Sequence, residues 1–140
     1  MNARTLGMAA VGLLAFGVAA TGCGGSSSSS STTASCTLPA GTGVCIEFST
    51  SGLSAAELSA VQSACSSNNL TYSAGACSAT NVVPGHCSIP ESTIGAYLPS
   101  APITSAEGFF YTPNFSATTA AATCSAALTS GGLGGTWVSG

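Results

Sequence analysis

The first pattern along the chain is an unbroken apolar run over residues 6–20, which follows a short polar start. That start contains Arg4, and the whole chain has one Lys or Arg. A membrane-spanning helix needs about 20 apolar residues, whereas this run is shorter and ends in small residues. A charged start, an apolar middle and a small-residue exit are typical of a secretory signal peptide. We therefore expect residues 1–22 to be a cleaved export signal.

A polar stretch and a lone cysteine follow the apolar run. Residues 24–34 are Gly, Ser and Thr with one Ala, a composition that buries little apolar surface and behaves as a flexible linker. Cys23 stands between the run and this linker, apart from the other cysteines. We therefore expect a flexible tether over 23–35, which begins at Cys23, and a six-cysteine domain over 36–140.

The pattern of the six-cysteine domain predicts a helix after Leu53. Ser54 and Glu57 have the spacing of a capping box, in which each side chain accepts from the backbone N–H of the other residue. Val61 and Cys65 then fall on one helical face. The capping role explains Glu57 better than a role as a catalytic acid.

A second helix signal begins at Ser116, where Ala121, Cys124 and Leu128 share a face. This segment is rich in Ala and Thr, has no Glu at the capping position and runs into two glycines. Each predicted helix therefore carries one cysteine on its apolar face, an arrangement that suits a disulfide to a neighbouring strand.

The folded part repeats one plan twice. Each copy has two cysteines around a Pro/Gly turn, an aromatic strand, a helix with a third cysteine and a closing aromatic segment. The matching segments are 36–45 with 77–87, 46–49 with 108–112, and 70–75 with 135–140. The second copy has an insertion, roughly 91–106, that is rich in Pro and Ser. This alignment divides the domain into halves 36–76 and 77–140.

These elements predict a small α+β fold of short, mostly antiparallel strands with two helices packed on one face. Mostly small side chains bury little apolar area, so disulfides at typically 2–4 kcal/mol each must add stability. Six cysteines in an exported domain indicate three disulfides, and fifteen pairings are possible. We prefer the pairs Cys45–Cys65, Cys87–Cys124 and Cys36–Cys77.

The residues at the signal exit resemble the lipobox of bacterial lipoproteins. Ala20-Thr21-Gly22-Cys23 matches this motif at its last three positions, whereas Leu is usual in place of Ala20. The resemblance implies that Cys23 is acylated and becomes the first residue of the mature chain, which also explains the odd count of seven cysteines. Two or three acyl chains, at about 0.8 kcal/mol per buried CH₂, form a lasting anchor. Cleavage after Ala20, giving a secreted protein, stays open.

Nearly the full chain resembles small, cysteine-rich bacterial lipoproteins of uncharacterised function. The shared features are the lipobox, the Ser/Gly tether, Gly-x-Cys strands, an Ala-rich helix ending in Cys and a terminal Gly-Thr-Trp. Gly24 stands where Asp would retain a lipoprotein in the inner membrane, which implies the outer membrane. The resemblance implies an envelope location and brings no activity, so it assigns no functional residue.

Charge excludes two classes of function. The titratable groups after the signal, apart from Tyr and Cys, are Glu47, Glu57, Glu91, Glu107 and His86. Nucleic-acid binding depends on Lys and Arg that neutralise phosphates, and so does electrostatic attachment to acidic lipid. We therefore expect no nucleic-acid partner.

Groups for catalysis are scarce as well. The chain has no Asp, no Gly-x-Ser-x-Gly motif and no Cys-x-x-Cys pair. His86 stands beside Cys87, but a disulfide at Cys87 leaves His86 as an ordinary strand or turn residue. We expect no enzyme activity, no metal site and no cofactor.

The leading hypothesis is a membrane-anchored envelope lipoprotein with a non-enzymatic structural or binding domain. Its partner would be an envelope protein or a glycan, with Tyr111 and Trp137 as contact aromatics, because aromatic rings stack on sugars and on protein side chains. For the aromatic residues as a set, we prefer the competing interpretation, in which they form the core. Alternative functions are an inhibitor or envelope enzyme module that exposes residues 90–105 as a loop, and a thiol- or metal-handling protein with free cysteines.

Overall fold

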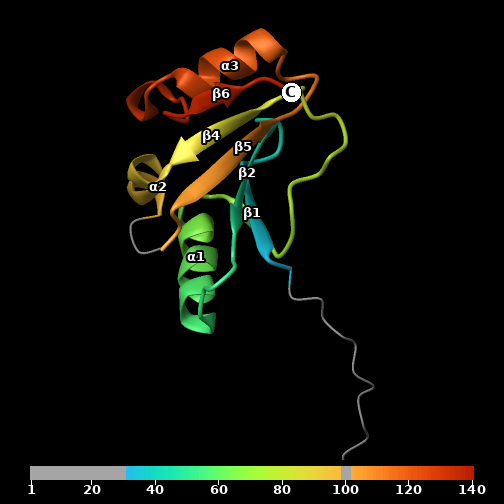
Figure 1. The fold of residues 1–140 in the computed structure, drawn as a ribbon. Coiled ribbons are helices and arrows are strands. Elements are labelled where there is room, and N and C mark those ends of the chain that lie inside the picture. The colour runs from blue at the N-terminus through green and yellow to red at the C-terminus, as the bar shows by residue number, and fades with distance from the viewer. Residues whose placement is uncertain (1–30, 99–101) are drawn as a thin grey trace, which may run out of the picture.

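The domain is built on a six-stranded sheet, and its helices lie in the segments of chain that connect the strands (Figure 1). This computed structural model describes residues 31–98 and 102–140, so the expected signal and Cys23 lie outside the described residues. The strands are β1 (Thr33–Thr37), β2 (Val44–Ser49), β3 (Thr71–Ser73), β4 (His86–Pro90), β5 (Ser105–Phe110) and β6 (Thr136–Val138). The helices are α1 (Ala55–Ser67), α2 (Glu91–Tyr97) and α3 (Ala117–Ser125), with a 3-10 turn η1 (Leu128–Ser130).

The sheet confirms the predicted α+β class. Its strand order is β3-β1-β2-β5-β4-β6, and each neighbouring pair is antiparallel. The first strand begins at Thr33, ahead of Cys36, so the folded part starts inside the range expected for the tether.

The internal repeat is confirmed by the pairing of the strands. In each half the first strand lies between the other two, and the second strands of both halves meet at the centre of the sheet. At the centre, Ile46 of β2 faces Gly108 of β5. The strand order of the sheet is approximately twofold symmetric about this pair. Cys36 faces Ile46 on one neighbouring strand. Cys87 faces Gly108 in the same way.

The expected alignment of the two copies is wrong by one cysteine. Cys36 corresponds to Cys87, since each occupies the same position in the first strand of its half. The closing aromatics agree with this, because Cys36 also faces Tyr72 and Cys87 also faces Trp137. Cys77 lies in the connection between the halves, outside the strands. The repeated Gly-x-Cys is therefore a coincidence of turn residues.

Both predicted helices begin with a reciprocal cap. The Ser54 hydroxyl accepts from the Glu57 N–H at 3.3 Å, and the Glu57 carboxylate accepts from the Ser54 N–H at 2.7 Å. At the start of α3 the same exchange joins Ser116 and Thr119, with distances of 3.3 and 2.8 Å. A threonine hydroxyl thus replaces the missing glutamate.

The buried faces of the helices agree with the prediction in part. Helix α1 buries Val61 and Cys65, as expected. Helix α3 buries Cys124 with Ala120, one residue before the expected Ala121. The residue after α3 has an extended backbone, which ends the helix. Leu128 therefore belongs to the separate turn η1.

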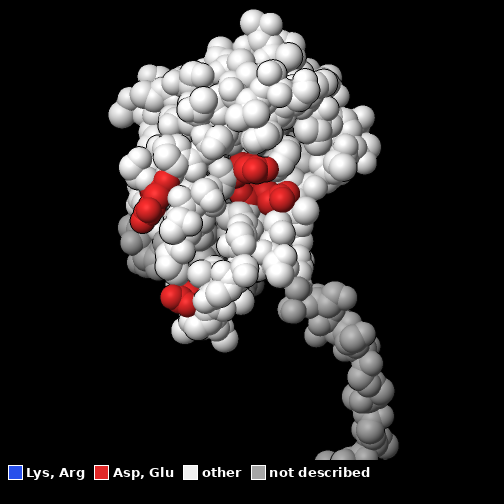
Figure 2. Space-filling view, in the orientation of Figure 1, with Lys and Arg blue, Asp and Glu red and all other residues white. Residues whose placement is uncertain are grey.

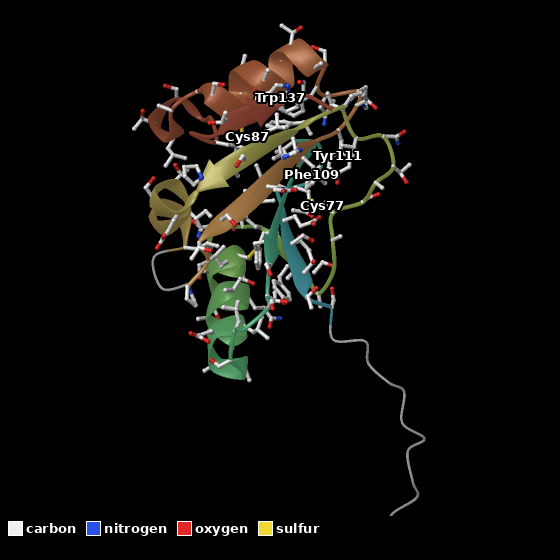
Figure 3. All side chains as sticks on the ribbon, viewed as in Figure 1. Cys77, Cys87, Phe109, Tyr111 and Trp137 are labelled. Atoms are coloured by element: carbon white, nitrogen blue, oxygen red, sulfur yellow. A yellow bond between two sulfur atoms is a disulfide. The ribbon has the colours of Figure 1, made fainter. Side chains whose placement is uncertain are left out.

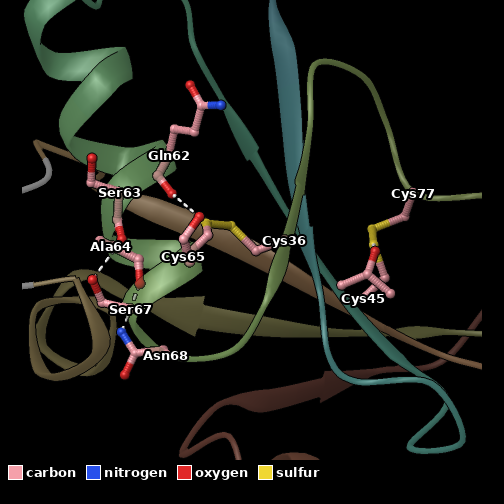
Figure 4. Close-up of a disulfide and its surroundings, with 11 residues drawn as sticks. Cys36, Cys45, Gln62, Ser63, Ala64, Cys65, Ser67, Asn68 and Cys77 are labelled. Atoms are coloured by element: carbon pink, nitrogen blue, oxygen red, sulfur yellow. Dashed lines mark hydrogen bonds between the residues drawn. A yellow bond between two sulfur atoms is a disulfide. The ribbon is translucent and has the colours of Figure 1, made fainter.

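The three disulfides are Cys36–Cys65, Cys45–Cys77 and Cys87–Cys124, with Cα separations of 6.0, 6.0 and 5.5 Å. The Cys87–Cys124 pairing is confirmed, and the other two preferred pairings are wrong. Side chains alternate between the faces of a strand. Cys45 lies directly opposite Thr37, one residue beyond Cys36, so Cys45 and Cys36 point to opposite faces of the sheet. Only Cys36 can reach α1, whereas Cys45 bonds to the connection on the other face (Figure 4).

The core lies between the sheet and the helices and contains most of the aromatic residues. Phe110 is 0% exposed, and its ring lies 4.8 Å from that of Phe115 and 5.8 Å from that of Trp137. The insertion of the second half forms α2, and its Ile94 and the neighbouring Leu98 are also buried. The insertion therefore contributes to the core and is not simply an exposed loop.

Acid is expected to weaken the start of α1. Hydrogen bonds from the Ser54 hydroxyl and N–H, both 2.7 Å, hold the pKa of Glu57 below its ordinary value of 4.5. Because the folded-state pKa is the lower one, the stabilisation is present above the unfolded pKa and is lost as the pH falls through the folded value. The protection of the first-turn amides of α1, measured as the exchange rate relative to the intrinsic rate at each pH, should fall over that interval.

Helix α3 is the internal control for this measurement, because its Ser116–Thr119 cap has no carboxylate. Its first-turn amides should keep their relative protection over the same pH interval. Equal fraying of both helices would contradict a specific effect of Glu57.

Candidate binding face

One face of the sheet lies opposite the helices, and part of it is open. Strand alternation places a set of polar and aromatic side chains there. We call this set the outer face: Glu47 of β2, His86 and Ser88 of β4, Glu107 and Phe109 of β5, and Thr136 and Val138 of β6. All of these residues are exposed or half-buried. Most of the surface around the acidic groups is uncharged (Figure 2).

Two carboxylates stand directly opposite each other at the centre of the outer face. Glu47 faces Glu107 across β2 and β5. Like charges in this position destabilise a sheet, so the pair does not serve the strand pairing. Glu47 has a structural partner, since its carboxylate accepts from the Cys77 N–H at 2.8 Å. Glu107 points outward, with 54% of its side chain exposed and the nearest His86 nitrogen 4.0 Å away.

Aromatic and apolar groups form a row beside the carboxylates. His86 of β4 and Phe109 of β5 lie side by side, with their ring centroids 6.2 Å apart. Val138 is paired with His86 across β6 and β4, and 41% of its surface is exposed. Aromatic rings that are partly exposed next to acidic groups offer both apolar contact and charge to a partner.

The connection between the halves limits how much of the outer face is open. The Cys45–Cys77 disulfide holds this segment over β2, and the Tyr111 hydroxyl donates to the Ser78 carbonyl at 2.8 Å. Burial first, and the Glu47 carboxylate second, raise the pKa of Tyr111 above its ordinary value of 10.0. The hydroxyl therefore stays protonated and keeps donating. The open part of the outer face lies over β4, β5 and β6.

The two aromatics expected as contacts do not form one surface (Figure 3). Trp137 is on the core side of the sheet, where it packs against Phe110 and over Gly85, whose φ of +110° and lack of a Cβ admit the ring. Tyr111 lies at the end of β5 and binds the connection on the other side. Each of the two has a structural partner.

The sequence reasoning did not separate Phe109 from the other aromatics as a surface residue, and it did not name His86 or Val138 as contacts. A signal was present in the run Phe109-Phe110-Tyr111, because alternate residues of a strand point to opposite faces. A fully buried Phe110 requires its two neighbours to face away from the core. The sequence does not show which face of the strand points to the core. It therefore does not decide whether Phe110 or its two neighbours are buried.

The fold defines a small, disulfide-rich α+β domain, and its three disulfides indicate an extracytoplasmic location. No family model, curated protein or solved structure matches this chain. Within residues 31–98 and 102–140, no helix is both long and apolar enough to cross a membrane. In the same ranges, His, Cys, Asp and Glu side chains do not gather into a group that could hold a metal ion.

Proposed function

We propose that this chain is a lipid-anchored protein of the bacterial cell envelope whose domain binds an envelope protein through the outer face. The observation that carries the proposal is the open side of a disulfide-bonded sheet, where Glu107 projects beside the ring of Phe109. The opposite side of the sheet holds the core and its helices, so the open side is available to a partner.

Charge complementarity points to a partner segment that carries Lys or Arg. The chain after Arg4 has no positive side chain except a protonated His86, so its own surface offers no counter-charge to Glu107 apart from that imidazole. Acidic patches meet basic ones in protein interfaces, and aromatic anchors beside them supply much of the affinity. A basic segment laid over β5 and β4 would meet both groups.

The alternative functions find less support in the geometry. The insertion places Ile94, Leu98 and Ile103 in the core, where an inhibitor would need an exposed loop. A thiol-handling role needs free cysteines, and each cysteine among the described residues is in a disulfide.

The anchor is tested by Cys23→Ala. With Cys23 acylated, the wild-type protein should fractionate with membranes, and its mature mass should begin at Cys23 with added acyl mass. The variant should lose the acyl mass and leave the membrane fraction, because a chain without acyl groups has no comparable apolar anchor. A wild-type mature chain that begins at Thr21 without lipid would contradict the anchor and make the protein a secreted one.

Two separate variants, Glu107→Lys and Phe109→Ala, test the outer face. A lysine opposite Glu47 replaces a like-charge pair with an attractive one, so Glu107→Lys should leave the fold at least as stable. It should nevertheless weaken partner binding, on the order of tenfold or more for a central contact. Glu91→Lys is the matched control, since Glu91 lies in the first turn of α2, outside the outer face.

Site-specific photo-cross-linking in intact cells identifies the partner. A photoreactive residue at Ser88 should cross-link to one envelope protein, and the cross-link should disappear in Glu107→Lys but remain in Glu91→Lys. The same photoreactive residue at Ser66, which is exposed on α1, should not capture that protein. Equal capture from both positions would contradict binding through the outer face. Retention on isolated envelope glycan that Phe109→Ala abolishes would assign the face to a glycan instead.

A further inference from the structure

A cavity of about 160 Å³ lies on the core side of the sheet, away from the outer face. Its walls come from both halves of the repeat, with Ile46 and Phe48 of β2 on one side and Ile89 of β4 and Leu133 on the other. Ile94 of α2 and its C-cap Leu98 also line the cavity. The cavity thus lies near the central pair of strands that relates the two halves.

The lining of this cavity is apolar almost throughout. Asn68, at the C-terminal end of α1, supplies an amide, and the amide nitrogen already donates to the Ala64 carbonyl at 2.9 Å. A buried water requires two to four polar partners, which such a lining does not offer. Water inside the pocket would therefore find few polar partners among the described lining residues.

This space is a pocket that is partly open to solvent and not a sealed void. Protein interiors are close-packed, and voids larger than a water molecule are few. The insertion of the second half builds part of the wall, since Ile94, Leu98 and Ile103 all belong to the segment that the first half lacks. These side chains of the insertion point into the core, yet they leave the space unfilled. The insertion therefore forms a wall of the pocket.

We propose that the cavity is a binding site for a small, uncharged, apolar molecule, of the size of one aromatic ring or a short branched hydrocarbon. An apolar cavity of about 150 Å³ lined by Leu, Ile and Phe admits benzene, which sets the scale of the ligand. None of the described residues that line the cavity has an ionisable side chain, so a charged ligand would lose its hydration without compensation from them. The site is independent of the outer face and of the anchor.

Benzene is the probe for the first experiment, on the full chain with its disulfides intact. In methyl NMR spectra the signals of Ile89, Ile94 and Leu133 should shift saturably as benzene is added. The methyl signals of Val138, on the outer face, should not. Shifts of Val138 as large as those of the cavity methyls, or no saturable shift in the cavity, would overturn the proposal.

A filled cavity provides the matched comparison. Ala106 lines the cavity, so Ala106→Leu should occupy the space and weaken benzene binding at least tenfold. Ser105→Leu adds the same side chain one residue earlier on the opposite face of β5 and should leave benzene binding unchanged. Equal benzene affinity in the two variants would overturn the assignment.

Ile103→Ala tests the site in the other direction and does not depend on whether the larger side chain is tolerated at 106. It widens the cavity, so naphthalene should shift the methyl signals of Ile94 in this variant and leave them unchanged in the wild type. Naphthalene binding of equal strength in both proteins would overturn the proposal.

Discussion

Replacing Cys87 and Cys124 together by alanine is expected to lower the free energy of unfolding by about 4 kcal/mol. The bond closes a sequence separation of 37 residues, and the chain-entropy model then gives a value of this size. Both cysteines are also 0% exposed, so their loss leaves space between β4 and α3. Urea denaturation followed by circular dichroism measures the difference from the wild type.

The Cys45→Ala, Cys77→Ala double variant is the control for loop closure. Its separation of 32 residues is similar, so the entropic loss should nearly match. Cys77 is only half-buried and lies in the connection between the halves, so less packing is lost. The Cys87–Cys124 variant should therefore be the less stable of the two. An equal or greater loss in the Cys45–Cys77 variant would contradict the packing contribution.

Phe110→Ala is expected to cost about 3–5 kcal/mol, the usual range for removing a buried phenylalanine side chain. Phe110 is fully buried, and the rings of Phe115 and Trp137 lie edge-on to it. The substitution leaves a cavity where β5, the start of α3 and β6 meet. The midpoint of urea unfolding should fall sharply, with a two-state transition retained.

Phe109→Ala is the matched control for this measurement. Phe109 has the same side chain on the neighbouring residue, but it is half-buried on the outer face. Its removal should cost clearly less than that of Phe110, because fewer contacts are lost. If both variants were equally destabilised, the outer face would be part of the core and would no longer be a candidate binding surface.

The pairing of the cysteines shows where sequence reasoning reached its limit. The helical positions of Cys65 and Cys124 follow from local spacing. Which strand cysteine meets Cys65 depends on the face to which each strand cysteine points. Cys36 and Cys45 are equally plausible by separation, and the register of β1 against β2 decides between them.

The site shows the same limit. Aromatic residues and glutamates are visible in the sequence, yet only the register brings Glu107 opposite Glu47 and places Phe109 beside His86. Trp137, one of the two aromatics named as possible contacts, is on the core side because it pairs with Cys87, which is fully buried.

By itself the sequence determined the elements whose signals lie within a few residues: the capped helices, the aromatic strands, the repeat and the presence of enough cysteines for three disulfides. These depend on hydrogen bonds and side-chain periods inside one turn or one strand. The tertiary structure decided the alignment of the two halves, two of the three cysteine pairs, the open outer face and the apolar cavity. Each of these depends on strand register, which a shift of one residue would invert because successive side chains point to opposite faces.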